Sequence, residues 1–111
     1  MHHRDQIIVE KVISEINIGC EMLGAATLEE FLADEKLKRA VSMTVINIGE
    51  LVKNVTDDTR KEYSQIPWKA IAGMRDIAAH KYQTLRMEDV YHTVYTDFPE
   101  LKKQLKTIIC E

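Results

Sequence analysis

The groups best suited to chemistry in this sequence are gathered in eight residues, 75–82, which read Arg-Asp-Ile-Ala-Ala-His-Lys-Tyr. Arg75 carries a permanent charge on a planar fork of N–H donors that fits a phosphate group. His80 has the side chain type that gains or loses a proton near neutral pH, as general acid–base catalysis requires. Asp76 precedes His80 by four residues, so on a helix it shares the same face and can orient the imidazole. The segment therefore predicts chemistry on a phosphate.

The surrounding residues add positive charge and small side chains. Tyr82 follows Arg75 by seven residues, which on a helix places both on one face. Three nearby cations add positive charge and would be the contacts if the protein binds RNA, namely Lys69, Lys81 and Arg86. Five small residues would let another molecule approach closely, and these are Ala70, Ala72, Gly73, Ala78 and Ala79.

Each of these residues also has a plainer interpretation, which the spacing alone leaves open. An arginine and a histidine on a polar helix face are often only solvated charges. The Asp76–His80 pair can be ordinary helix support that contributes about 0.2–0.5 kcal/mol. Tyr82 can be a core aromatic residue, which is also the role expected for Trp68.

Length and composition bound the class of protein. The chain has 111 residues, which is enough for one domain over 1–111 and leaves no room for a second core. Its 15 basic and 18 acidic residues give a formal net charge of −3, which argues against a protein that grips nucleic acid by bulk positive charge. Any contact with RNA must therefore come from a local patch.

The remaining features exclude several other classes. Cys20 and Cys110 match neither a zinc spacing nor a disulfide framework, so we expect idle thiols, no metal site and no cofactor. No apolar run approaches the ~18 residues that a membrane span needs, and the first residues lack the apolar stretch of a signal peptide. We therefore expect a cytoplasmic protein with no membrane partner.

The apolar spacing is helical nearly throughout, and glycine and proline are scarce. The first helix is predicted over about 5–23, with Gly24 as its stop. Thr27 and Glu30 have the spacing of a capping box, which predicts a second start there. A short helical turn over 27–33 would then lead into the next long helix.

The second long helix is predicted over about 34–55, where the apolar stripe is strongest. A polar loop follows, including Asp57 and Asp58, with one short turn over 59–64. Pro67 is predicted to open the third helix, which extends to about Tyr82. The last helix begins near Met87, and Pro99 should kink it or restart it. These elements predict an all-α, antiparallel four- to five-helix bundle, with apolar surface to spare for a homodimer.

The longer pattern around residues 75–82 resembles the HEPN superfamily, in its HepT-like toxin branch. The central string Arg75-x4-His80-x-Tyr82 follows Ile66-Pro67-Trp68 and Ala72-Gly73-Met74. Two other segments are similar to the family's elements in the second and last helices, Ile48-Gly49-Glu50 and Asp97-Phe98-Pro99-Glu100-Leu101. The resemblance covers most of the chain. It departs from the branch at Asp76, where the branch often has asparagine, although other HEPN proteins carry a polar or acidic residue there.

The resemblance implies a HEPN-like fold and a specific activity. HEPN toxins of this branch are metal-independent endoribonucleases that work as homodimers, within a type II or type VII-like toxin–antitoxin pair. Their partner is a minimal nucleotidyltransferase antitoxin, which silences the toxin by transferring AMP to the tyrosine of the motif. Carried over to this chain, the catalytic residues are Arg75 and His80, and the AMPylated residue is Tyr82.

The helical angle favours a composite site independently of the resemblance. Five residues separate Arg75 from His80, so the two point about 140° apart on a straight helix. Two chains around a two-fold axis can aim Arg75 of one subunit and His80 of the other at one phosphate. Two alternatives stay open: a non-catalytic HEPN dimer that binds RNA or a nucleotide, and a scaffold for the nucleotidyltransferase.

Overall fold

The computed structural model describes residues 1–80 and 86–109, and it gives the backbone but not the side chains of residues 75–80. All regular structure in these ranges is helical, which confirms the all-α prediction. In chain order the helices are α1 (His3–Leu23), α2 (Leu28–Ala33), α3 (Glu35–Lys53), α4 (Asp57–Glu62), α5 (Trp68–His80), α6 (Met87–His92), the π-helix η2 (Thr93–Asp97) and α7 (Phe98–Ile109).

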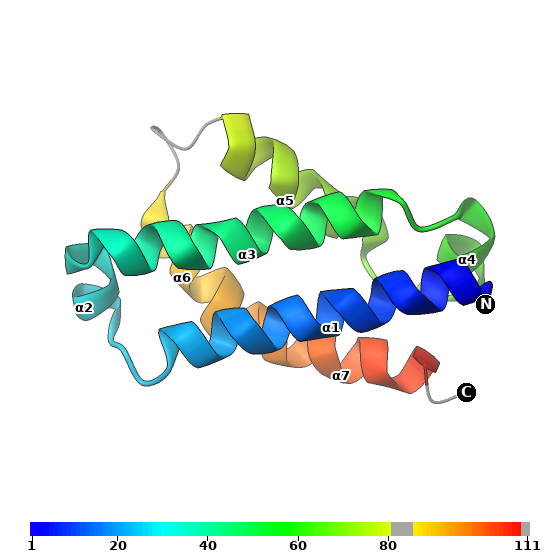
Figure 1. Ribbon diagram of the computed structural model, residues 1–111, viewed down its shortest axis with the longest axis horizontal. Coiled ribbons are helices and arrows are strands. Elements are labelled where there is room, and N and C mark those ends of the chain that lie inside the picture. The colour runs from blue at the N-terminus through cyan, green and yellow to red at the C-terminus, as the bar shows by residue number, and fades with distance from the viewer. Residues whose placement is uncertain (81–85, 110–111) are drawn as a thin grey trace.

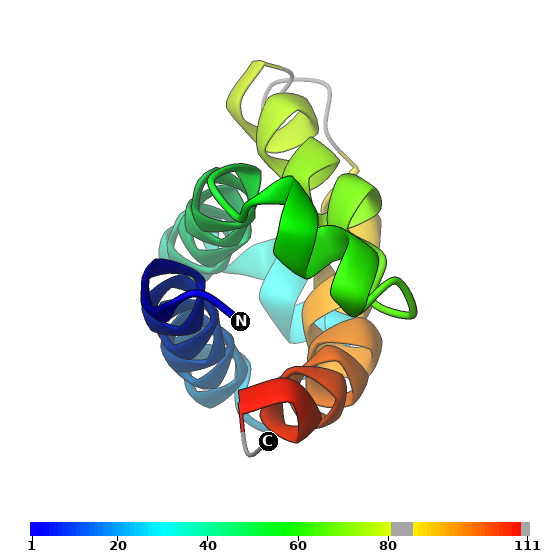
Figure 2. The ribbon, with the colours of Figure 1, turned by 90° about the vertical axis from the view of Figure 1, so that its right-hand side faces the viewer.

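The long helices form an elongated antiparallel bundle with extents of 42 × 27 × 19 Å. Helix α3 returns alongside α1, α5 packs on α3, and α7 packs on α1 (Figure 1). Seen end-on, the helices surround a common centre, and the start of α1 and the end of α7 lie at the same end of the bundle (Figure 2). Among the described helices, none has both the length and the apolar character that crossing a membrane requires.

Helix α1 ends and α2 begins where the sequence predicts. Gly24 has a φ of +52°, a left-handed conformation that favours glycine, and its N–H donates to the Cys20 carbonyl at 2.9 Å. The Thr27 hydroxyl accepts from the Glu30 N–H at 3.1 Å, and the Glu30 carboxylate accepts from the Thr27 N–H at 3.0 Å. The predicted capping box is therefore confirmed.

The core is built from the predicted stripes of α1 and α3, joined by residues of the other helices. Its fully buried large side chains include Ile16, Phe31, Ile48, Ile66, Ile71, Phe98 and Leu105. Gly19 lets α1 and α3 approach closely, because a Cβ at this position would lie 2.8 Å from the Thr44 hydroxyl. The bundle therefore depends on a small residue in the middle of an otherwise large-residue stripe.

The predicted polar loop after the second long helix is shorter than expected. Helix α3 ends at Lys53, and Asp57 and Asp58 form the first turn of α4 instead of belonging to the loop. The Thr56 side chain caps this helix by accepting from the Thr59 N–H. Carboxylates in a first turn are also favourable because they face the positive end of the helix dipole. The prediction of a loop over Asp57 and Asp58 is therefore wrong.

The disruption predicted at Pro99 takes the form of the π-helix η2. The Phe98 N–H donates to the Thr93 carbonyl, five residues back, and Pro99 has no N–H to donate. The Val94 carbonyl therefore receives no hydrogen bond from the N–H of Phe98 or from Pro99. It accepts a hydrogen bond from the Cys20 thiol instead, at 3.8 Å. Burial raises the pKa of this thiol and outweighs the opposing effect of the positive charge of Lys102.

Candidate functional site

Helix α5 carries the predicted chemical groups along its second half. Its range, Trp68–His80, includes Arg75, Asp76 and His80 and confirms a helix at these positions. The side chains of these three residues lie outside the described part of the structure, and so do Lys81 and Tyr82 entirely. Five residues of helical rise separate the backbones of Arg75 and His80 by about 7.5 Å along the axis.

The start of α5 is fixed in the core. Trp68 is 5% exposed, and its indole N–H donates to the Tyr63 carbonyl at 3.0 Å. Its backbone N–H donates to the Ile66 carbonyl at 2.8 Å, and the Ile71 N–H donates to the Pro67 carbonyl at 3.0 Å. The core role predicted for Trp68 is therefore confirmed, and the helix begins one residue after Pro67.

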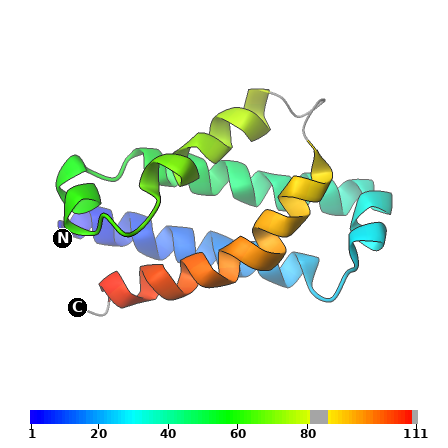
Figure 3. The same ribbon diagram turned by 180° about the vertical axis from the view of Figure 1, so that it is seen from behind.

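The other end of α5 inclines away from the bundle. From Trp68 onwards the helix separates progressively from α3, which the views from the front and from behind both show (Figures 1 and 3). On the α3 side, the Ser42 hydroxyl contacts the Met87 sulfur at 3.8 Å and ties the start of α6 to α3. The backbone that carries Arg75 and His80 is thus presented at the edge of the molecule.

The described small residues of α5 leave an open surface. Ala70 is exposed, Ala72 and Gly73 are half-buried, and a Cβ at Gly73 would meet no atom within 4 Å. Glycine inside a helix is destabilising by about 1 kcal/mol relative to alanine. Among the described residues, no atom lies close enough to Gly73 to require a glycine there.

Lys69 and Arg86, two of the three candidate RNA contacts, lie far apart in the chain: one in the first turn of α5 and the other just before α6. Lys69 is exposed in the first turn of α5. Arg86 immediately precedes α6, and its guanidinium lies 3.7 Å from the Glu88 carboxylate, with 72% of its side chain exposed. The Glu88 charge offsets part of the attraction of Arg86 for a phosphate. Lys69 is therefore the stronger candidate of the two.

The structure adds a cation that the sequence analysis did not single out. The Arg60 guanidinium donates to the Val52 carbonyl at 2.8 Å and to the Val55 carbonyl at 3.2 Å, just at the end of α3. These bonds hold its charge beside the start of α5, where it lines the same depression as Lys69. Nothing in the local sequence distinguishes Arg60 from a solvated helical arginine, because one acceptor lies at the end of α3 and the other in the connection that follows it.

Metal ligands do not gather in the part of the chain that the structure describes. No group of three or more histidine, cysteine, aspartate or glutamate side chains comes together within residues 1–74 and 86–109. Beside the first turn of α5, the described structure offers two cations, Arg60 and Lys69, together with the hydroxyl of Ser64 and four apolar residues, Ile66, Pro67, Trp68 and Ala70.

Comparison with known proteins gives a consistent family. The family model for ribonuclease HepT-like proteins matches residues 6–108. The chain is 36% identical over 101 residues to "Putative RNase TTE0752" of Caldanaerobacter subterraneus subsp. tengcongensis, covering 91% of this chain and 90% of that protein. It is 31% identical over 106 residues to "Probable ribonuclease HepT" of Thermococcus cleftensis, covering 96% and 94% respectively. No solved structure gives a significant match.

Proposed function

The chain belongs to the HepT-like ribonuclease family, and on that premise we propose that it is a metal-independent endoribonuclease acting as the toxin of a type II or type VII-like toxin–antitoxin pair. The observation that carries the proposal is the family match over 6–108, because this range contains the whole of α5 with Arg75 and His80. Both residue types suit phosphodiester cleavage.

The proposed reaction is attack by the ribose 2′-hydroxyl on the adjacent phosphorus. One His80 takes the proton from the 2′-hydroxyl as the new O–P bond forms, and a second His80 gives a proton to the 5′-oxygen as its bond to phosphorus breaks. Arg75 binds the phosphate and stabilises the charge that develops on it. Asp76 orients His80. The products are a 2′,3′-cyclic phosphate and a free 5′-hydroxyl.

A homodimer would complete this site. The geometry of one helix separates Arg75 and His80 by about 140°, so one chain cannot easily direct both at one phosphate. The open surface at Gly73 supports close approach by a second chain, since the glycine has no steric reason within the described monomer. Met43 on α3, which is 53% exposed, offers apolar area that such an interface could cover.

Regulation by a minimal nucleotidyltransferase antitoxin is the second part of the proposal. AMP groups on Tyr82 would add negative charge and bulk beside Arg75, where the RNA phosphate must bind. The mass of the intact chain, purified with and without the transferase, tests this directly. We expect additions of whole AMP units that disappear in Tyr82→Phe, and an unmodified wild-type chain would contradict the regulation but not the nuclease.

The nuclease is tested with purified protein and single-stranded RNA in the presence of EDTA. We expect cleavage by the wild type and by Lys103→Ala, which alters an exposed lysine on α7, and no cleavage by Arg75→Ala or His80→Ala. Mixing the two inactive variants should not restore wild-type activity, because a mixed dimer contains one Arg75 but only one His80, whereas the proposed mechanism uses two His80 side chains. Cleavage that survives both substitutions, or that vanishes in EDTA, would overturn the mechanism.

Two non-catalytic roles are distinguished by the same preparations. RNA binding without any cleavage product would favour a binding module. Co-purification with the transferase, together with normal growth when this chain is expressed alone, would favour a scaffold.

A further inference from the structure

A depression of about 630 Å³ lies beside the first turn of α5. This volume falls within the range of small-molecule sites, ~300–1,000 Å³. The residues that line it come from α4, the connection and α5, and they are Arg60, Ser64, Ile66, Pro67, Trp68, Lys69 and Ala70. All seven residues lie in the part of the chain that the structure describes.

The lining combines an apolar floor with a positively charged rim. Four of the seven residues are apolar. Ile66 and Trp68 are buried beneath the floor at 2% and 5% exposure, so the exposed Pro67 and Ala70 present most of its apolar surface. Among the described residues that line the depression, the two charged ones, Arg60 and Lys69, are both cations, and none is a carboxylate. An apolar floor beside positive charge complements a nucleotide, which joins a flat apolar base to an anionic phosphate.

The rim and floor are held in place by named contacts. Arg60 is anchored through its hydrogen bonds to the Val52 and Val55 carbonyls, so its charge is fixed at the rim before any ligand arrives. The Trp68 indole is anchored by its bond to the Tyr63 carbonyl. A site that is already ordered loses less conformational entropy when a ligand binds.

The depression also lies on the helix that carries the proposed catalytic groups. Six residues separate Lys69 from Arg75, which corresponds to about 9 Å along the axis of α5. The two positions also lie about 120° apart around the helix axis, so an RNA strand whose reacting phosphate is bound at Arg75 must curve around α5 to lay a nearby nucleotide over the depression.

We propose that this depression is a subsite for an unpaired nucleobase of the RNA, with Lys69 and Arg60 binding the adjoining phosphate. The inference rests on the proposed function for the identity of the substrate. Proteins recognise single-stranded RNA mainly by placing splayed bases against apolar or aromatic side chains with cations along the backbone. The subsite would favour single-stranded substrates, since a paired base cannot enter it.

The single tryptophan of the chain gives a direct test, because Trp68 lines the depression. Titration of the full chain with AMP, CMP, GMP and UMP should change Trp68 fluorescence saturably, with free tryptophan as the control for absorption by the nucleotide. Ala70→Leu fills the depression from an exposed helical position and should weaken binding about tenfold or more. Lys69→Gln should weaken it less and reduce its salt dependence. Lys103→Gln is the matched control and should bind as the wild type does.

The outcomes separate this inference from the nuclease itself. An absence of saturable binding by the wild type, or unchanged binding by an Ala70→Leu variant that unfolds normally in urea, would overturn the subsite even if RNA is still cleaved. Saturable binding that Ala70→Leu abolishes would support the subsite even if Arg75→Ala and His80→Ala show that the proposed cleavage mechanism is wrong. In an active enzyme, Ala70→Leu should raise KM for single-stranded RNA with little change in kcat.

Discussion

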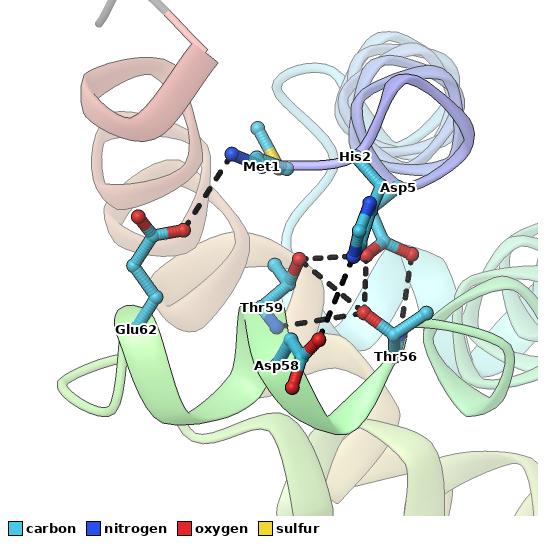
Figure 4. Close-up of polar contacts among 7 residues, drawn as sticks. All are labelled: Met1, His2, Asp5, Thr56, Asp58, Thr59 and Glu62. Carbon is cyan, nitrogen blue, oxygen red and sulfur yellow. Dashed lines mark hydrogen bonds and ion pairs between the residues drawn. The ribbon is translucent and has the colours of Figure 1, made fainter.

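The carboxylate of Asp5 accepts a hydrogen bond of 2.6 Å from the hydroxyl of Thr59, which lies 54 residues further along the chain. The same carboxylate accepts from the Thr56 hydroxyl at 2.5 Å and from the Thr56 N–H at 3.1 Å (Figure 4). Asp5 is fully buried. The beginning of α1 is thereby tied to the first turn of α4, the short helix that precedes α5.

Replacing Asp5 should destabilise the fold. Asp5→Asn removes the charged acceptor and replaces one carboxylate oxygen by an NH2 group, which cannot accept from the Thr56 and Thr59 donors. We therefore expect the free energy of unfolding to fall by about 1–3 kcal/mol. Urea unfolding followed by circular dichroism measures this change. Asp58→Asn is the control, because the Asp58 side chain is 85% exposed, and it should stay within about 0.5 kcal/mol of the wild type. Equal stability of both variants would contradict a structural role for the Asp5 network.

The same network predicts how stability depends on pH. Burial by itself would raise the pKa of Asp5. The hydrogen bonds from Thr56 and Thr59 and the charge of His2 lower the pKa by more than burial raises it, so the pKa lies below its ordinary value. The unfolded chain therefore binds this proton at a higher pH than the folded chain does. The stabilisation is complete above an unfolded-state pKa of about 4 and is lost as the pH falls through the lowered folded pKa.

Unfolding experiments between neutral pH and pH 2 should show this loss in the wild type. Asp5→Asn should lose less stability over the acid range, because the variant has no proton to take up at this position. Parallel pH profiles for the two proteins would contradict the assignment.

Gly24 and Gly73 should respond oppositely to alanine. At Gly24, a φ of +52° strains any side chain, so Gly24→Ala should destabilise the fold by about 1–2 kcal/mol. At Gly73, a Cβ would enter open space within a helix, so Gly73→Ala should stabilise the monomer by about 0.4–1 kcal/mol. Unfolding at low protein concentration measures both, and destabilisation by Gly73→Ala would show a requirement for glycine within the monomer itself.

A side chain at position 19 requires the Thr44 side chain to move. A Cβ on Gly19 would lie 2.8 Å from the Thr44 hydroxyl, which is buried and bonded to the Val41 carbonyl at 2.7 Å. We expect Gly19→Ala to destabilise the fold by about 1–3 kcal/mol through overpacking. Thr44→Ala removes the obstructing atom, so the double variant should lose less stability than the two single losses added together. Strict additivity would show that α1 and α3 relax in some other way.

The local features of this protein follow from its amino-acid sequence alone. The apolar stripes predict the long helices, and Thr27, Gly24 and Pro67 mark their ends, because caps and turns depend on residues only a few positions apart. The segment containing Arg75 and His80 and its family resemblance were also evident from sequence alone. The comparisons confirm that family, while the roles of Arg75, Asp76, His80 and Tyr82 stay predictions.

The tertiary structure decided the features that join distant residues. An aspartate in the first turn of an amphipathic helix is normally solvated, yet Asp5 is buried because Thr56 and Thr59 lie opposite it. Arg60 faces the start of α5 because the end of α3 and the connection that follows it supply its acceptors. Hydrogen bonds and burial depend on which groups meet in space, and local periodicity carries no information about a partner from another helix. The depression beside Lys69 could therefore be recognised only after the chain had folded.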